Sequence, residues 1–403
     1  MSNIVVIGAG QAGCSLVARL RALGHDGGIT LIGAEPVPPY QRPPLSKKYL
    51  LGEMAVERLY LRAESYYPEA DIRLITDQAV TAIDRAARTI TVGDQVLPYD
   101  QLALTTGSVA RRLPSRIGGD LGGVYVVRTL ADVDAMAPEF RTGARVLIVG
   151  GGYIGLEAAA VAAKLGLQVT LVEMADRILQ RVAAPETSAY FRDLHRSHGV
   201  DLREGVGLDR LDGTDRVTGA VLSDGSTLEL DFVIVGVGIA PASALAEQAG
   251  LLIDNGIAVD ARGQTSDPAI WAAGDCASFP YSGARIRLES VQNAIDQAEC
   301  VAENMLGPAR DYDPHPWFWS DQYDVKLQIA GLNTGYDRVV IRPGDKEGAI
   351  SHWYFAGQTL LAVDAMNDPR AYMVGKRMLE NGVNATPDQI ADPATNLMAL
   401  MKQ

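Results

Sequence analysis

Two glycine-rich runs of one type are the residues of this chain that point most clearly to chemistry. Each follows a short apolar stretch, residues 4–7 and 146–149, and each reads G-x-G-x-x-G. In such a run the first glycine permits a tight turn, the second lets backbone approach a pyrophosphate, and the third lets a helix pack on a strand. Two copies predict that one chain binds two dinucleotides and passes electrons between them. The candidate contacts are Gly8, Gly10 and Gly13, and Gly150, Gly152, Tyr153, Ile154 and Gly155.

The same elements must position both runs. A helix is predicted over residues 14–23 and another over 156–165, each ended by a glycine (Gly24 and Gly166). Strands follow at residues 29–32 and 169–172, and each is followed by an acid, Glu35 or Glu173, where a carboxylate accepts ribose hydroxyls. The alternative is that both runs are ordinary glycine turns of an α/β sheet.

Composition limits the protein class. The 403 residues are 47% hydrophobic, which supports two or three domains with a substantial core. No run approaches the ~20 apolar residues that cross a membrane, and the N-terminus enters the first strand directly, so we expect a cytoplasmic protein without a leader peptide. The net charge of −13 argues against nucleic acid or an anionic membrane as a partner. Three cysteines without C-x-x-C argue against a disulfide framework and a dithiol centre.

Two further stretches distinguish the nucleotides. Residues 102–108, which include Thr106 and Gly107, resemble the strand and turn that flavin disulfide-reductase-like folds place between their nucleotide modules. Residues 265–275 resemble the second FAD motif of those folds, in which an aspartate, here Asp275, binds the ribityl chain. This resemblance implies FAD at the N-terminal site and NAD(P) at the second site.

The predicted fold class is therefore α/β, with two Rossmann-like dinucleotide-binding domains of the glutathione-reductase type and a C-terminal α+β domain. The FAD-binding domain is discontinuous, because the second FAD motif requires the chain to return to it. The predicted domains are 1–113 with 242–315 for FAD, 114–241 for NAD, and 316–403 at the C-terminus, which opens with Trp317-Phe318-Trp319.

Glu173 favours NADH over NADPH, because a carboxylate at this position repels a 2′-phosphate. Arg177, four residues on, is the opposing signal, since it reaches a phosphate if the loop folds back.

Nearly the whole chain resembles the FAD-dependent NADH:ferredoxin reductases of bacterial oxygenase systems, of the putidaredoxin reductase and biphenyl-dioxygenase reductase type. The resemblance implies hydride transfer from NADH to FAD, then single electrons to a 2Fe–2S ferredoxin that supplies a monooxygenase or a ring-hydroxylating dioxygenase. The stretches that carry it are 42–47, 150–157, 274–276, 289–294 and 317–323.

The same resemblance implies roles for individual residues. Lys47, Glu157 and Trp319 are the predicted catalytic residues, near the flavin edge, the nicotinamide and the exposed flavin edge respectively. An aspartate is common at position 34, where this chain has Ala34, so the ribose contact falls to Glu35. The other predicted cofactor contacts are Ala12, Arg42, Val80, Arg128, Val291 and Gly238.

The residues alone also fit this chemistry. Hydride transfer needs the nicotinamide stacked on the flavin, and a cation beside the flavin raises its potential. Lys47 is the candidate cation; its alternative role is a salt bridge, with Glu157 as partner, and both roles are compatible. Trp319 has core packing as its alternative.

Absences narrow the reaction. Residues 41–47 contain no thiol, which disfavours peroxidase and disulfide reductase activity, and Cys14 and Cys276 are predicted to be structural. His195 and His198 lack metal-ligand spacing and are predicted to lie on the surface or cap a helix, and no metal is implied.

The ferredoxin docking surface is not visible in the sequence. Residues 310–346 contain no basic run, so either a patch assembles in the fold or docking rests on apolar contact near Trp317. The competing functions are an NADH oxidase or diaphorase with quinone or oxygen as acceptor, and a redox-switched binding protein like apoptosis-inducing factor.

Overall fold

The computed structural model describes residues 2–401, which form two compact units assembled from separate stretches of the chain. Unit 1 contains the chain up to Gln41 together with Ala55–Val109 and Ile239–Pro314. Unit 2 contains Arg42–Met54, Ala110–Gly238 and the chain from His315 onward. Residues 239–314 therefore share a unit with the first glycine motif. The three-domain division stays a prediction.

A five-stranded parallel sheet forms the centre of unit 1, in the order β19-β7-β1-β2-β3. Its strands are mostly buried, as parallel strands covered on both faces are. The strands are β1 (Ile4–Ile7), β2 (Ile29–Ile32), β3 (Ile72–Ile75), β7 (Gln101–Leu104) and β19 (Ile270–Ala272).

Two long helices cover one face of this sheet, α1 (Gln11–Ala22) and α7 (Val291–Met305). Leu16 of α1 and Val301 of α7 are buried in one core with Val6 of β1. The opposite face packs in a second core with α6 (Ala244–Gln248), β4 (Val80–Asp84), β5 (Thr89–Val92), β6 (Gln95–Pro98), β18 (Ile257–Ala258), β20 (Ala277–Tyr281) and β21 (Ala284–Ile286). The short helix α2 (Tyr66–Glu69) buries Tyr67 in the first core, together with α1. The remaining elements are β8 (Ser108–Ala110), whose last residue belongs to unit 2, β17 (Ile239–Pro241) and the 3₁₀ turn η2 (Val56–Arg58).

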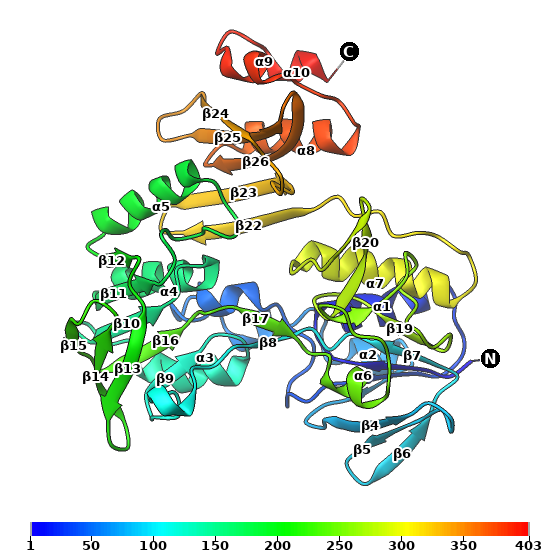
Figure 1. The fold of residues 1–403 in the computed structure, drawn as a ribbon. Coiled ribbons are helices and arrows are strands. Elements are labelled where there is room, and N and C mark those ends of the chain that lie inside the picture. The colour runs from blue at the N-terminus through cyan, green and yellow to red at the C-terminus, as the bar shows by residue number, and fades with distance from the viewer. Residues whose placement is uncertain (1, 402–403) are drawn as a thin grey trace. The chain divides into compact units, whose positions relative to one another are not determined.

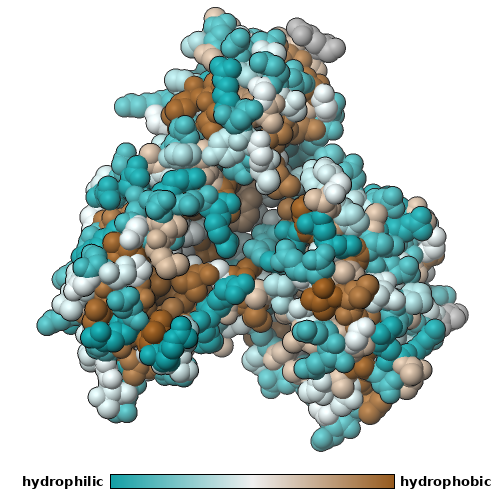
Figure 2. Space-filling view, in the orientation of Figure 1, coloured by the Kyte–Doolittle hydropathy of each residue, from teal (hydrophilic) through white to brown (hydrophobic). Residues whose placement is uncertain are grey.

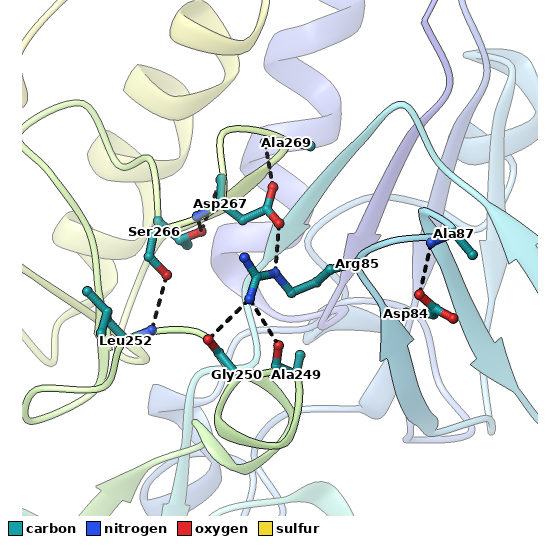
Figure 3. Close-up of polar contacts among 10 residues, drawn as sticks. Asp84, Arg85, Ala87, Ala249, Gly250, Leu252, Ser266, Asp267 and Ala269 are labelled. Carbon is teal, nitrogen blue, oxygen red and sulfur yellow. Dashed lines mark hydrogen bonds and ion pairs between the residues drawn. The ribbon is translucent and has the colours of Figure 1, made fainter.

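Arg85 forms hydrogen bonds that link the early stretch of unit 1, residues 55–109, to its late stretch, residues 239–314 (Figure 3). Its Nε donates to Oδ2 of Asp267 at 2.7 Å, and its Nη1 donates to the carbonyl oxygens of Ala249 and Gly250 at 3.3 and 3.2 Å. One guanidinium thus binds the loop after α6 and the loop before β19, and this helps to place β19 at the edge of the sheet.

Unit 2 contains a second parallel sheet, in the order β12-β11-β10-β16-β9. Its strands are β9 (Val124–Val126), β10 (Arg145–Val149), β11 (Gln168–Glu173), β12 (Asp201–Glu204) and β16 (Phe232–Val235). It is joined by α3 (Leu130–Met136), α4 (Tyr153–Lys164), α5 (Pro185–Ser197), the antiparallel strands β13 (Leu208–Gly213), β14 (Val217–Leu222) and β15 (Thr227–Glu229), and the 3₁₀ turns η1 (Pro43–Ser46), η3 (Ser115–Ile117) and η4 (Ala137–Glu139).

The C-terminal part of unit 2 is an antiparallel sheet, in the order β22-β23-β26-β25-β24 (Figure 1). Its first strand begins at Trp317, and the sheet buries Trp353 and Val363 against Val374 and Met378 of α8. The elements are β22 (Trp317–Gln322), β23 (Val325–Gly331), β24 (Arg338–Pro343), β25 (Ile350–Ala356), β26 (Thr359–Met366), α8 (Pro369–Glu380), α9 (Pro387–Ala391) and α10 (Leu397–Leu400).

The predicted α/β class with two dinucleotide-binding sheets and a C-terminal domain is confirmed. The predicted starts of the two motif helices are wrong: α1 begins at Gln11 instead of residue 14, and α4 begins at Tyr153 instead of residue 156. Each helix starts directly after the second glycine of its motif, so its unpaired N–H groups lie in the glycine loop. The predicted glycine ends are present, with Gly24 and Gly166 at φ +81° and +78°.

A buried polar network joins α5 to the C-terminal sheet within unit 2. Thr187 Oγ1 donates to Oδ2 of Asp364 at 2.8 Å and lies 2.8 Å from Nδ1 of His352, and the hydroxyl of Tyr354 also donates to Asp364. Burial raises the pKa of Asp364 to about 6, although both hydroxyls act in the opposite direction. Burial lowers the pKa of His352 to about 4.

These two groups have opposite effects on stability between about pH 4 and 6. The folded protein protonates Asp364 where the unfolded chain does not, so this carboxyl destabilises the fold as pH rises through the window. The folded protein keeps His352 neutral where the unfolded chain is protonated, so this ring destabilises the fold as pH falls. The two effects therefore oppose each other in the native protein.

We therefore expect Asp364→Asn to lose stability more steeply than wild type on acidification from pH 6.5 to 4. The excess should reach about 3 kcal/mol, the free energy that corresponds to raising the pKa of Asp364 from its ordinary value to about 6. Urea unfolding followed by tryptophan fluorescence at several pH values measures the slope, and His352→Gln should change it in the opposite sense. Parallel pH profiles for wild type and Asp364→Asn would contradict this account.

Within residues 2–401 no helix is long and apolar enough to cross a bilayer. Hydrophilic and hydrophobic side chains are interspersed over the visible surface (Figure 2). Across the same described residues, no cluster of three or more His, Cys, Asp and Glu side chains is arranged to hold a metal ion.

Candidate dinucleotide and electron-transfer sites

The glycines of the first motif occupy three different environments. Gly8 has φ +114°, and a Cβ there would lie 2.2 Å from the carbonyl oxygen of Thr105. A Cβ on Gly13 would lie 2.1 Å from the carbonyl oxygen of Gly8, so the turn and the helix contact through bare backbone. A Cβ on Gly10 would meet nothing within 4 Å. The free space at Gly10, at the start of α1, is where a pyrophosphate would bind.

The second motif, in unit 2, repeats this geometry. Gly150 has φ +109°, and its Cβ would lie 2.4 Å from the carbonyl oxygen of Gly236. A Cβ on Gly155 would lie 2.1 Å from the carbonyl oxygen of Gly150, and a Cβ on Gly152 would meet nothing within 4 Å. Both motifs therefore fit a dinucleotide pyrophosphate at the N-terminus of a helix.

Glu35 lies beside the first motif. Its Oε2 accepts a hydrogen bond from the hydroxyl of Tyr40 at 2.6 Å. A Cβ on Gly33 would lie 2.6 Å from Cβ of Ala9, so the turn that carries Ala34 and Glu35 packs directly on the glycine loop. The segment leading to Val80 is bonded to the same turn, with Asp77 N donating to the Glu35 carbonyl and Gln78 N to the Gly33 carbonyl.

Asp275 also belongs to unit 1. It follows β19 and Gly274, and its Oδ2 accepts from the Ser108 hydroxyl at 2.8 Å. Gly274 lies against Ala12 of α1, since a Cβ at Gly274 would be 3.1 Å from that of Ala12. The second predicted FAD motif thus packs on the first. Thr106 and Gly107 lie in the turn after β7, and Val291 is the first residue of α7.

Glu173 lies at the mouth of the second motif. Its Oε2 accepts from Gly151 N at 2.7 Å and its Oε1 from Ala175 N at 2.8 Å, so the carboxylate is held beside the glycine loop. Arg177 Nη1 donates to Oγ of the buried Ser188 at 2.5 Å. The guanidinium that opposed the NADH prediction is therefore hydrogen-bonded to α5 in this structure.

Exposed apolar side chains flank Glu173 and the second motif. Ile154 of α4 is 43% exposed and Met174 is 80% exposed. Ligand sites are lined mostly by apolar side chains, so Ile154 and Met174 are available to pack against a bound nucleotide. Gly238 follows β16 with φ +98°.

Glu157 gathers a compact polar cluster in unit 2. Its side chain is 3% exposed, and Lys47 Nζ lies 2.9 Å from its Oε1. The hydroxyl of Ser46 donates to Oε2 and that of Ser320 donates to Oε1, each at 2.7 Å. The predicted salt bridge is present, and Trp319, half-buried, precedes Ser320 on β22.

The segment that carries Lys47 is anchored along its length. Arg42 Nη1 donates to the carbonyl oxygen of Arg128 at 2.7 Å, and the Tyr49 hydroxyl donates to Asp134 at 2.6 Å. Two predicted cofactor contacts, Arg42 and Arg128, are thereby neighbours.

Tyr153 is the first residue of α4. Its hydroxyl is buried and has no hydrogen-bond partner, and its ring lies 4.9 Å from that of Phe318. Burial raises the pKa of this hydroxyl well above its ordinary value, so it stays protonated. Of the three aromatic residues 317–319, Trp317 packs against the core of the C-terminal sheet.

The prediction that His195 is a surface or capping residue is wrong. Its side chain is fully buried because the face of α5 that carries it packs against β22, where Nε2 lies 2.8 Å from Oε1 of Gln322. His198 is exposed and ends α5, as predicted. The sequence analysis assigned no role to Ser46, Ser320 and Gln322, although all three lie in the stretches 42–47 and 317–323 that carry the resemblance.

The three cysteines are buried and unbridged. Burial raises the pKa of Cys14, Cys276 and Cys300, which disfavours a reactive thiolate at these positions.

A family model described as pyridine nucleotide-disulphide oxidoreductase matches residues 2–298, and a reductase C-terminal model matches residues 317–401. A ferredoxin–NAD(P)⁺ reductase from Sphingomonas is 45% identical over 94% of this chain and 92% of its own length. Rhodocoxin reductase from Rhodococcus erythropolis is 42% identical over 97% and 92%. The reductase in a solved covalent putidaredoxin reductase–putidaredoxin complex matches with a TM-score of 0.96 and 39% identity, covering 100% of this chain and 98% of that one.

Proposed function

Since the chain belongs to the pyridine nucleotide-disulphide oxidoreductases, we propose that it is an NADH-dependent, FAD-containing ferredoxin reductase. It takes a hydride from NADH and passes single electrons to a 2Fe–2S ferredoxin that supplies a monooxygenase or a ring-hydroxylating dioxygenase, in the cytoplasm. The observation that carries this proposal is the pair of complete glycine motifs, each with its middle glycine facing free space.

Unit 1 supplies the contacts to the FAD pyrophosphate, ribose and ribityl chain in this proposal. The N–H groups at the start of α1 hold the pyrophosphate, Glu35 accepts ribose hydroxyls, and Asp275, oriented by Ser108, accepts from the ribityl chain. Bound FAD supplies the change from a two-electron donor to one-electron acceptors. The remaining proposed FAD contacts are Gly8, Gly10, Ala12, Gly13, Ala34, Arg42, Lys47, Val80, Thr106, Gly107, Arg128 and Val291.

Unit 2 supplies the NADH contacts. The N-terminus of α4 holds the pyrophosphate at Gly150, Gly152 and Gly155, next to Tyr153, Ile154 and Gly238. Glu173 accepts the ribose hydroxyls. Glu157 orients the nicotinamide, and Lys47 provides positive charge that stabilises the reduced cofactor, with Trp319 at the edge from which electrons leave.

We expect Glu173→Gln to keep NADH activity and admit NADPH, because the amide still accepts from Gly151 N but no longer repels a 2′-phosphate. Glu173→Ala should lower kcat/KM for NADH by about 10- to 100-fold, since a hydrogen bond to a charged group contributes about 1.5–3 kcal/mol. Steady-state kinetics with both nucleotides measure the ratio. An unchanged NADH preference in both variants would place nucleotide choice elsewhere.

The acceptor is tested by cytochrome c reduction with NADH. The proposal predicts rapid reduction only when a 2Fe–2S ferredoxin is added. Equally fast transfer to quinone or oxygen without ferredoxin would favour an oxidase or diaphorase. A long-lived complex of reduced protein with NAD⁺ that changes oligomeric state would favour a redox-switched binding protein.

A further inference from the structure

Glu157 stands at one end of a continuous chain of hydrogen bonds within unit 2, which is buried except at its partly exposed Tyr323 end. Ser320 donates to Glu157, and Gln322 Nε2 lies 3.2 Å from Ser320 Oγ. Gln322 Oε1 lies 2.8 Å from His195 Nε2, and His195 Nδ1 lies 3.1 Å from the hydroxyl of Tyr323. Ser320, Gln322 and His195 are at most 1% exposed.

The hydrogen-bonding capacity of each group shows that all the hydrogen bonds in this chain donate toward Glu157. A carboxylate only accepts, so the single hydroxyl hydrogen of Ser320 goes to Glu157 and its oxygen must accept from the amide NH₂ of Gln322. The carbonyl of Gln322 then faces His195, so Nε2 of His195 carries a hydrogen. Burial lowers the pKa of His195 to about 4, so the ring is neutral at pH 7 and its Nδ1 accepts from Tyr323.

The backbone and a ring contact hold Tyr323 in position for its hydrogen bond to His195. It lies in the two-residue turn between β22 and β23 with φ +55°, a backbone conformation that is rare for an aromatic residue. Its ring stacks on that of His198, with centroids 3.7 Å apart. Burial raises the pKa of the Tyr323 hydroxyl, so it remains a donor.

We infer that Ser320, Gln322, His195 and Tyr323 are positioning residues that act as one donor chain directed at Glu157. Each donor polarises the next, so the chain spreads the negative charge of Glu157 away from Lys47 and fixes the carboxylate in place. The inference rests on the proposed function, in which Lys47 and Glu157 set the charge at the flavin and nicotinamide.

The first test measures the direction of the hydrogen bonds in the donor chain and does not require catalytic turnover. Nitrogen-15 NMR of the oxidised holoenzyme with labelled histidine, its His195 signal assigned by loss in His195→Gln, should show the Nε2–H tautomer. In Gln322→Leu the Nε2 partner is gone, and the tautomer should become mixed. An Nδ1–H tautomer in wild type overturns the inference.

The second test measures the effect of the donor chain on the midpoint potential of the flavin. Without the Ser320 hydroxyl the full charge of Glu157 faces Lys47, so Ser320→Ala should lower the flavin midpoint potential. The expected shift is about tenfold in the ratio of oxidised to reduced flavin, about 30 mV for a two-electron couple. Ser320→Thr should restore the potential, and Ser351→Ala, a buried serine of the same sheet that accepts from Trp353 Nε1, should not shift it.

The variant Lys47→Met distinguishes a failure of the donor chain from a failure of the proposed role of Lys47. A shifted potential in Lys47→Met but not in Ser320→Ala overturns the donor chain alone. An unchanged potential in both variants overturns the proposed role of Lys47, and the donor chain then loses its purpose with it. A shift in both, with rescue by Ser320→Thr, supports the inference.

Discussion

Gly152→Val is expected to abolish flavin reduction by NADH while the purified protein stays yellow. Gly152 has extended backbone, with φ −80° and ψ 177°, and no atom lies within 4 Å of a Cβ placed there, so valine fits without strain in the fold. Its methyl groups would instead fill the space at the start of α4 that the NADH pyrophosphate needs. A misplaced substrate costs about 100-fold or more in rate, so kcat/KM should fall by at least that factor.

Flavin absorbance after purification and anaerobic stopped-flow reduction by NADH measure the two halves of this expectation. Chemical reduction with dithionite should still bleach the variant, which shows that the flavin itself is intact. Loss of flavin from Gly152→Val, with NADH binding retained, would mean that the two nucleotides are assigned to the wrong sites.

Gly10→Val should have the complementary effect, an apoprotein that still binds NADH. Gly10 is the matched position in unit 1, with φ −103° and free space around its Cβ position. Valine there excludes the FAD pyrophosphate and leaves the second motif untouched. We expect retention of FAD to fall from full occupancy to a few per cent or less, on the order of the 100-fold loss expected for Gly152→Val.

The control for both variants is a change at a glycine that folding itself requires. Gly13→Ala would bring a Cβ within 2.1 Å of the Gly8 carbonyl oxygen, so it should lower the melting temperature, whereas Gly10→Val should not do so beyond the effect of losing FAD. Equal FAD contents in Gly10→Val and wild type would mean that the FAD pyrophosphate does not bind at this loop.

The glycines were readable from sequence because their chemistry demands one residue type at fixed spacing. A turn at φ +114° and a helix that packs through bare backbone exclude other side chains, so Gly8 and Gly13 mark the turn and the helix together. The helix starts were misplaced because no capping side chain marks them: the cap positions are Gly10 and Gly152, whose backbone fills the role.

The cluster around Glu157 was only partly readable. Lys47 and Glu157 were identified through motifs, but Ser46 and Ser320 lie 111 and 163 residues from Glu157 in the chain, and serine is common in any segment. The burial of His195 was not predicted because it results from packing of one face of α5 against β22. The mixed polarity of the α5 sequence does not show which face packs or against which element. Such contacts depend on tertiary packing and not on local pattern.

The most direct test of the account is anaerobic stopped-flow absorbance of the holoenzyme mixed with NADH, with and without a 2Fe–2S ferredoxin. The account predicts rapid flavin bleaching, followed by reduction of the ferredoxin in single-electron steps and return of the oxidised flavin spectrum. Bleaching that is never followed by ferredoxin reduction, across several ferredoxins, would contradict the proposed electron path.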